Sequence, residues 1–474
     1  MTSNKILKGF SWAAVDRITT QLSLFVVGII IARLVSPSDY GILGLLLVFV
    51  NIAQVFVDSG LGSALIFFNN LEEKDIRTTF TFNIFVSSII IVILYVAAPL
   101  FDRFFNNDTF HIYLRVISLQ ILINSLIVVP ISMLKIRLDF RSIAIANTVA
   151  ATFSGALGII IAYMGAGIWA LIAQVIARST IVLIITFCAC RYIPRIGLDV
   201  SALTKLFGYS INIFGASCIT RLIEEGTSFV VGKYFSPHNL GLYTKANQFS
   251  LLPSSSIGSI IITVLFPSLA RVKDDSILFD KLYTNVLKIL SLLSVPFFVL
   301  MAVLAEPLVR VVLTDKWIEV VPYLQILCVG KILFPLSNIS EQAINAKGYS
   351  RLYFQQQVVK MFAKLLLIIP AVFVGIEAVV IADALSYFAA FFITQYFGAK
   401  CGMPTVGAQI RLIYPYVVAS LIAGIVVFSS LDMYFENGLL KITIYGLLYV
   451  IIYGSVLFIQ DPSIYRFACS VLKK

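Results

Sequence analysis

The chain has 474 residues, of which 59% are apolar and only 12% are charged, and its mean hydropathy is +0.97. Soluble proteins have about 25% charged residues, so this chain would expose large apolar patches in water. The composition therefore excludes a soluble fold. It also excludes an outer-membrane barrel, because barrel strands alternate apolar and polar residues over about ten positions, whereas residues 412–431 form an almost continuous apolar run.

The hydropathy pattern predicts an all-α integral membrane protein with about fourteen transmembrane helices of about 20 residues each. In chain order we expect them at residues 9–35, 39–68, 78–105, 111–136, 141–164, 167–192, 203–231, 239–270, 282–305, 318–345, 351–373, 377–399, 408–431 and 437–460. The longest polar connections, at 191–205 and 271–281, are too short to form a soluble domain. Membrane enzymes that build polysaccharides usually carry a large soluble loop or a clustered acidic motif, so the pattern favours a transporter.

The net charge of +11 comes from basic residues that are distributed unevenly between the two sides of the membrane. With the N terminus inside, 21 of the 35 Lys and Arg residues lie on the cytoplasmic side, and the opposite loops hold only Arg103, Lys233, Arg310, Lys316 and Lys441. Such a bias marks the cytoplasmic face. We therefore expect a multi-pass membrane protein with both termini cytoplasmic, and no nucleic-acid partner.

Cysteine and histidine residues give no indication of a metal site. The six cysteines lie in or beside apolar segments, and the only two histidines, His111 and His238, lie at loop edges. Disulfide frameworks and zinc sites need closely spaced ligands in loops. We therefore expect no metal, no cofactor and no catalytic residue.

A short internal repeat indicates two related halves. Ser36-Pro-Ser-Asp-Tyr-Gly41, after the first helix, recurs as Ser236-Pro-His-Asn-Leu-Gly241, after the seventh helix. Proline is expected to open the next helix, and glycine to permit a tight turn. Since each half has an even number of helices, we expect a parallel repeat about an axis along the membrane normal. The predicted division is an N-terminal six-helix lobe at 1–200, a C-terminal six-helix lobe at 201–403 and two additional transmembrane helices at 404–474.

Several segments together resemble one known family. In the first half they are Lys8-Gly-Phe-Ser-Trp12, Ala32-Arg-Leu34 with the following Ser-Pro and Tyr-Gly, and Asp58-Ser-Gly-Leu-Gly-Ser-Ala-Leu-Ile66. In the second half they are Leu240-Gly-Leu-Tyr-Thr-Lys-Ala246 and Val264-Leu-Phe-Pro-Ser-Leu-Ala-Arg271. They look like the polysaccharide transporter family, the Wzx-type flippases of the multidrug/oligosaccharidyl-lipid/polysaccharide exporter superfamily. The resemblance implies two six-helix lobes around a central cavity. Relatives often place one Asp in the middle of the seventh helix, whereas this chain has Glu224-Glu225 away from the middle.

Charged residues within the spans are functional candidates because a charge in lipid is costly. The cargo implied by the resemblance, an undecaprenyl-diphosphate-linked oligosaccharide, carries a diphosphate that Arg and Lys would bind. The candidate cations are Arg17, Arg178, Arg221, Lys331, Lys360 and Lys364. Lys360 and Lys364 lie one turn apart on one face, and we expect both to face the central cavity. The alternative is that their long side chains reach the membrane interface.

Two of these cations have acidic neighbours in the sequence. Arg17 follows Asp16, and Arg221 lies one turn before Glu225. Each arginine therefore fits a self-neutralising structural pair as well as it fits a cargo-binding site.

Polar side chains at helical spacing suit a hydroxyl-rich sugar. The candidates for sugar binding are Asn51 and Gln54 in the second span, and Gln120 and Asn124 in the fourth. Interhelical hydrogen bonding is the alternative role for each set. The acids that could exchange a proton or a sodium ion are Asp58, Glu224, Glu225 and Asp383.

These features favour a flippase that moves a lipid-linked oligosaccharide repeat unit outward by alternating access, for capsule, O-antigen or exopolysaccharide assembly. The expected partners are the lipid-linked oligosaccharide, membrane lipids, a polysaccharide polymerase and a chain-length regulator. A multidrug cation exporter coupled to protons or sodium ions is the alternative within the fold, and a basic cavity disfavours it because like charges repel in a low dielectric. A membrane glycosyltransferase or polymerase is the less favoured alternative from another class.

Overall fold

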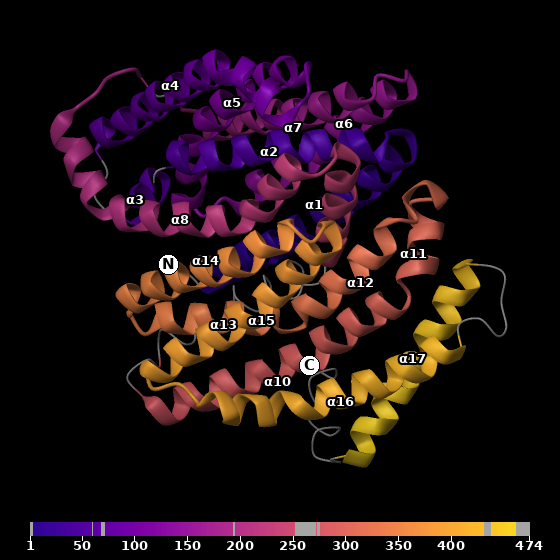
Figure 1. The fold of residues 1–474 in the computed structure, drawn as a ribbon. Helices are drawn as coiled ribbons and strands as arrows, with labels where there is room; N and C mark the ends of the chain where they lie inside the picture. The colour runs from indigo at the N-terminus through magenta and orange to yellow at the C-terminus, as the bar shows by residue number, and fades with distance from the viewer. Residues whose placement is uncertain are drawn as a thin grey trace. The chain divides into compact units, whose positions relative to one another are not determined.

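The computed structural model describes residues 3–58, 60–67, 72–192, 195–251, 272, 275–430 and 438–460. Within these ranges it describes side chains from residue 19 onward, except those of residues 63, 67, 209, 210, 212, 213, 216, 276 and 350. Every regular element among the described residues is a helix (Figure 1). Eleven of the described helical segments are long and apolar enough to cross a membrane. The all-α membrane fold is thus confirmed, while the count of fourteen spans stays a prediction.

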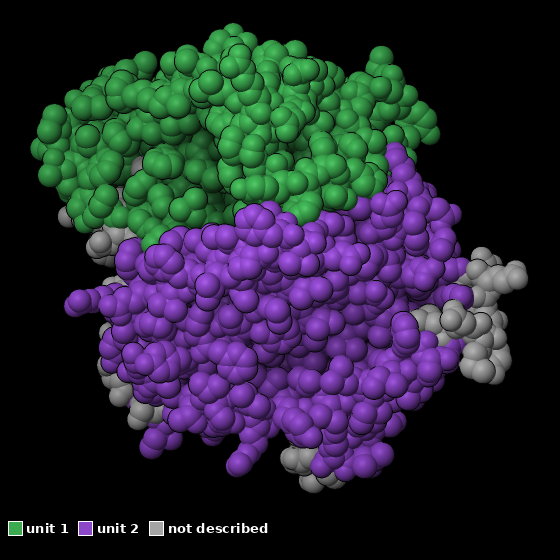
Figure 2. All heavy atoms as spheres, in the orientation of Figure 1, with its two compact units in different colours: residues 1–241 green, residues 242–474 purple. Residues whose placement is uncertain are grey.

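The chain forms two compact units, residues 1–241 and residues 242–474 (Figure 2). Unit 1 contains α1 (Ser3–Leu34), α2 (Pro37–Asp58), α3 (Leu61–Phe67), α4 (Glu73–Phe105), α5 (Phe110–Ile136), α6 (Phe140–Tyr163), α7 (Ile168–Cys190) and α8 (Val200–Tyr234). Helix α8 packs on α2, α3 and α4. The expected lobe boundaries at residues 200 and 403 stay predictions.

Unit 2 begins within a helical segment at residues 237–251. Its further elements are α10 (Ser276–Val303), α11 (Ala305–Val312), η1 (Asp315–Trp317), α12 (Val320–Gly330), η2 (Lys331–Leu333), α13 (Phe334–Ala346), α14 (Ser350–Val372), α15 (Ile376–Lys400), α16 (Val406–Ser430) and α17 (Gly438–Gln460). Helix α15 packs on α12, α13 and α14, and α16 packs on α10 and α17.

Two helices that the hydropathy pattern predicts as continuous are interrupted. The helix expected at 39–68 ends at Asp58, and Gly60 has a φ of 73°, which a right-handed helix does not allow. The helix expected at 318–345 is divided by η2, and Pro335 stands at the start of α13. Proline has no backbone N–H to donate to the preceding turn. This second interruption puts Lys331 at a helix junction inside unit 2.

The predicted role of Gly41 as a turn residue is wrong. Pro37 does open α2, but Gly41 lies within that helix, in its second turn. A Cβ atom on Gly41 would lie only 1.8 Å from the carbonyl oxygen of Pro237. The glycine is therefore required for close approach of two backbones and not for a turn.

Helix faces are sorted by polarity in the way expected of a protein in lipid. Val92, Val96 and Leu100, spaced by one turn on α4, are 62%, 71% and 67% exposed. The buried face of α6 instead carries small residues at the same spacing, including Ser154 and Gly158, and packs on α1 and α7. Small residues let helices approach closely where the hydrophobic effect contributes little.

Aspartates cap helices at three of the connections. The side chains of Asp139, Asp199 and Asp275 accept hydrogen bonds from the backbone at the start of α6, α8 and α10. Such caps satisfy backbone donors that the helix leaves unpaired. The pKa of Asp199 is lowered mainly by the hydrogen bond from the Ser201 hydroxyl and, to a smaller extent, by the one from the Ala202 backbone N–H.

Candidate functional site

The predicted sugar-binding residues of unit 1 lie on two helices that pack on each other, α2 and α5, and are here called the amide track (Asn51, Gln54, Gln120 and Asn124). The Asn124 amide donates to Gln54 Oε1 at 3.0 Å, and the Gln54 amide donates to Asp58 Oδ1 at 2.9 Å. One turn earlier on α2, Asn51 donates to Glu225 Oε1 of α8 at 2.8 Å. The polar residues that the sequence places on two separate helices are therefore in contact in the structure, through Asn124 and Gln54.

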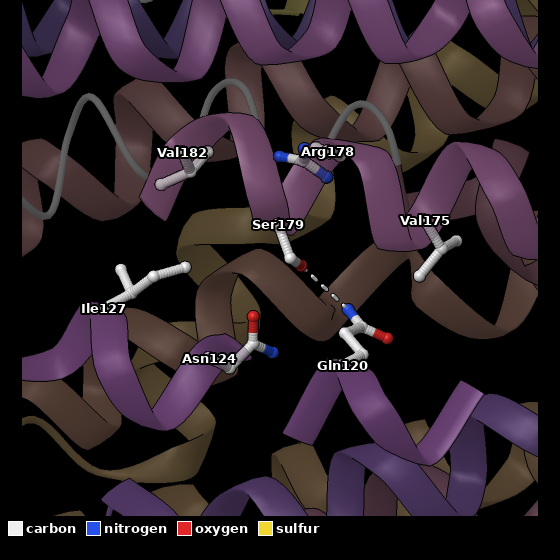
Figure 3. Close-up of a pocket in the computed structure, with 7 residues that line it drawn as sticks. All are labelled: Gln120, Asn124, Ile127, Val175, Arg178, Ser179 and Val182. Carbon is white, nitrogen blue, oxygen red and sulfur yellow. Dashed lines mark hydrogen bonds between the residues drawn. The ribbon is translucent and has the colours of Figure 1, made fainter. Parts of the chain in front are cut away.

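A cavity of about 240 Å³ lies beside this track, between α5 and α7 (Figure 3). Gln120 and Asn124 line it from α5, and Arg178 and Ser179 line it from α7, together with Ile127, Val175 and Val182. The Gln120 amide donates to the Ser179 hydroxyl at 3.3 Å, while the buried Gln120 Oε1 has no hydrogen-bond partner. The wall thus offers an acceptor to a hydroxyl group, next to a guanidinium. Ser179 is a lining residue that the sequence analysis missed.

The acids of α8 are held by an arginine on their own helix. Arg221 lies 2.9 Å from Glu224 and 3.9 Å from Glu225, in agreement with the structural pairing that its spacing allows. Its side chain and that of Glu224 are about half exposed, at 41% and 54%. The side chain of Arg17 lies outside the described residues.

Unit 2 contains a different kind of polar interior. Lys364 of α14 lies 3.0 Å from Asp383 of α15, and the Asp383 carboxylate also accepts from the Tyr243 hydroxyl at 2.9 Å. Asp383 is fully buried, and Lys364 is 7% exposed. The side chain of Lys364 therefore ends inside the protein and does not reach the membrane interface.

Lys360, one turn earlier on α14, has its own carboxylate. It forms an ion pair with Glu341 of α13, and Glu341 also accepts from Gln357 at 3.2 Å. Each ammonium group of the two lysines therefore has an acidic partner on a neighbouring helix. The expectation that both lysines face the central cavity stays a prediction.

Lys331 is the third lysine of this region and is fully buried. Its ammonium group donates to Asn247 Oδ1 and, at 2.7 Å, to the Ser250 hydroxyl. The Tyr387 ring lies close to both Lys331 and Lys364, with its centroid 5.3 Å from Lys331 Nζ and 6.0 Å from Lys364 Nζ. The hydrogen bonds that the structure describes for Lys331 are all with neutral groups.

We call Lys331, Lys360, Lys364, Glu341 and Asp383 the lysine cluster. It contains three ammonium groups and two carboxylates, so one positive charge is in excess when all five are ionised. Among the described residues, no three His, Cys, Asp or Glu side chains lie close enough together to hold a metal ion. With all five groups ionised, the excess positive charge would attract an anion and repel a cation.

A family model described as polysaccharide biosynthesis protein matches residues 30–322, which is more than half of the chain. The chain belongs to this family. The resemblance seen in the sequence motifs is thereby confirmed, and the protein is a multi-pass membrane protein.

Named relatives of this family member are transport and biosynthesis proteins. The succinoglycan biosynthesis transport protein ExoT of Rhizobium meliloti (strain 1021) is 24% identical over 71% of this chain and 68% of its own length. The lipopolysaccharide biosynthesis protein WzxC of Escherichia coli (strain K12) is also 24% identical, over 78% of this chain and 75% of its own.

Solved structures show the same fold. The lipid II flippase MurJ, in an inward closed conformation, has a TM-score of 0.77 at 16% identity, over 95% of this chain and 98% of that one. An inward-facing multidrug transporter of the MATE family has a TM-score of 0.62 at 14% identity, over 82% and 99%.

Proposed function

We propose that this protein flips an undecaprenyl-diphosphate-linked oligosaccharide outward across the bacterial inner membrane by alternating access. The cargo would serve capsule, O-antigen or exopolysaccharide assembly, as the relatives named for succinoglycan and lipopolysaccharide biosynthesis suggest. The observation that carries the proposal is the lysine cluster of unit 2, where three buried ammonium groups face only two carboxylates.

An uncompensated charge in a low-dielectric interior costs several kcal/mol or more. A diphosphate would supply the missing negative charge, and ammonium groups bind phosphate as compact point charges. In the proposed site Lys331 makes the first contact, because its present partners Asn247 and Ser250 are neutral. Lys364 and Lys360 then bind the phosphates as well, and the phosphates replace Asp383 and Glu341 as their anionic partners.

The amide track and the cavity of unit 1 would bind the oligosaccharide. Carboxamides both donate and accept hydrogen bonds, which matches the hydroxyl groups of a sugar. Gln120 and Asn124 line the cavity with Arg178, and Asn51 and Gln54 extend the polar surface along α2. Arg17 and Arg221 remain proposed phosphate contacts. Asp58, Glu224, Glu225 and Asp383 remain the proposed groups for exchange of a proton or a sodium ion.

The multidrug cation exporter of the same fold is disfavoured by the sign of this charge. An excess ammonium group inside the protein would repel a cationic drug.

The proposal also includes cytoplasmic termini, and a polymerase and a chain-length regulator as partners. It describes a transporter and not an enzyme.

The experiment removes charge from the cluster in balanced pairs, so that no buried carboxylate loses its cation. We expect K364Q/D383N and K360Q/E341Q to reach the membrane at normal levels and to lose most export of the repeat unit, because each variant removes one of the three ammonium groups of the proposed anion site. Export is measured in cells that lack the native gene and is normalised to the protein in the membrane.

The matched control is K281Q/K400Q, which removes two exposed ammonium groups and should export normally. Arg at position 360 or 364 keeps the charge and should retain partial export. Wild-type export by both balanced variants would contradict the proposed anion site. The site would then be sought at Arg17, Arg178 or Arg221.

A further inference from the structure

The two copies of the repeated hexapeptide contact each other directly. A Cβ atom on Gly41 would lie 1.8 Å from the Pro237 carbonyl oxygen, and a Cβ atom on Gly241 would lie 1.8 Å from the Pro37 carbonyl oxygen. All four residues belong to unit 1. We call this reciprocal contact the Gly–Pro crossing. It has the pattern of a contact about a two-fold axis, in which each copy supplies the same surface to the other.

Both helix starts at the crossing are built in the same way. The Asp39 backbone N–H donates to the Ser36 hydroxyl at 3.1 Å, and the Asn239 backbone N–H donates to the Ser236 hydroxyl at 3.2 Å. These caps fix where each helix begins, and they set each proline and glycine at the same position in its first turns. The repeat in the sequence is thus explained by one shared contact.

A cluster of phenylalanines lies beneath the crossing and joins α8 to α2 and α4. The ring centroid of Phe229 lies 6.4 Å from that of Phe49 and 5.9 Å from that of Phe105. Phe101 packs on Phe49 at 4.6 Å, and Phe110 packs on Phe105 at 5.3 Å. The crossing and the cluster both lie at helix ends that the basic-residue bias places outside.

We propose that the Gly–Pro crossing is the closing contact of an outer gate, with the phenylalanine cluster as its seal. This inference rests on the proposed transport function and adds the residues that open and close the path. A backbone contact between glycines has no interlocking side chains, and a gap of about 1 Å already removes up to about half of its dispersion attraction. Such a contact closes tightly and still releases in every cycle.

The test adds a methyl group at the crossing. G41A and G241A should hold the gate open, because the packed helices can accept a Cβ only if they separate. The control is G28A, since a Cβ at Gly28 would meet nothing within 4 Å. The reporter is T227C in a chain without its native cysteines, because Thr227 of α8 is fully buried and lies two residues before Phe229.

We expect an impermeant maleimide added outside intact cells to label T227C at least about tenfold faster with G41A or G241A than without them, as a minor open state becomes the major one. G28A should label as slowly as the parent. Labelling that stays slow with G41A, or that rises equally with G28A, would overturn the proposal. The readout needs no cargo, so failure of the transport function would appear separately, as missing export by the parent.

A second experiment covers the case in which the alanine variants fail to reach the membrane. Lys233 Nζ lies 3.8 Å from the centroid of the Phe104 ring, which places α8 next to the end of α4. A short bifunctional maleimide should join F104C to K233C in the folded protein and stop export, whereas a monofunctional maleimide should not. Export by the cross-linked protein, or failure of the two positions to cross-link, would overturn the gate.

Discussion

The polar interiors of the two units differ although both are bundles of apolar helices. In unit 1 the amide track joins helices by hydrogen bonds, from Asn124 to Gln54 and from Asn51 to Glu225, and the nearby Arg221 and Glu224 are about half exposed. In unit 2 full charges are buried, and they are paired between helices, as in Lys364 with Asp383. Amides in lipid need only a partner amide, whereas a buried ammonium group needs a counter-charge. The comparison teaches that breaking the Lys364–Asp383 pair of unit 2 should cost more than breaking an amide hydrogen bond of unit 1.

The largest effect is expected when the buried pair of unit 2 is broken on one side. D383N should lower the free energy of unfolding by about 3–5 kcal/mol, because it leaves the Lys364 ammonium group buried without its carboxylate. The measurement is thermal or denaturant unfolding of the purified protein in detergent, with K364Q and K364Q/D383N alongside.

The double variant should be less destabilised than the sum of the two single variants, since it removes both charges. Simple additivity would show that the two groups do not interact in the folded protein, and the contrast between the units would lose its main support.

A smaller effect is expected in unit 1. N124L removes the hydrogen bond to Gln54 and should cost about 1 kcal/mol, since interhelical hydrogen bonds in membrane proteins contribute roughly 0.6–2 kcal/mol. Q54L should behave alike, and the double variant should cost little more than either one. A decrease in the free energy of unfolding as large as that of D383N would mean that the amide track stabilises the fold as much as the buried ion pair does.

The smallest effect is expected at an exposed ion pair of unit 2. Arg310 of α11 lies 3.0 Å from Glu306 and also contacts Asp315. The hydrogen bond that Arg310 donates to Glu306 is the main cause of its raised pKa, and the hydrogen bond that it donates to Asp315 adds to the effect. Water and salt screen such a pair, so R310Q should leave the unfolding temperature unchanged within error. A clear decrease in the unfolding temperature would show that burial does not explain the difference between the Arg310–Glu306 pair and the Lys364–Asp383 pair.

Local features of the sequence predicted most of the described long helices. Within lipid each span must satisfy its own backbone hydrogen bonds, so a run of apolar residues such as 412–431 is enough to place α16 at Val406–Ser430. The interruption at η2 was missed, because the apolar run continues through it and only Pro335 indicates a break.

The sequence identified several side chains of the candidate site individually, but it did not predict which of them are in contact. Lys364 was selected as a phosphate contact and Asp383 as an ion-exchange acid, and the structure joins them at 3.0 Å. Tyr243, which donates to the same carboxylate from 140 residues away, was not selected. A tyrosine in an apolar helix has no pattern that distinguishes a hydrogen-bonded ring from a packing one.

The sequence by itself determined that this protein is a helical membrane protein of a polysaccharide transporter family, and which side chains need partners inside it. Hydropathy and motif spacing are local properties, so they can be read without the fold. Only the tertiary structure decided that Glu341 and Asp383 are those partners, and that Gly41 serves a helix crossing. Charge neutralisation and backbone approach depend on the rotation and register of helices far apart in the chain, and these are set by packing of the whole unit.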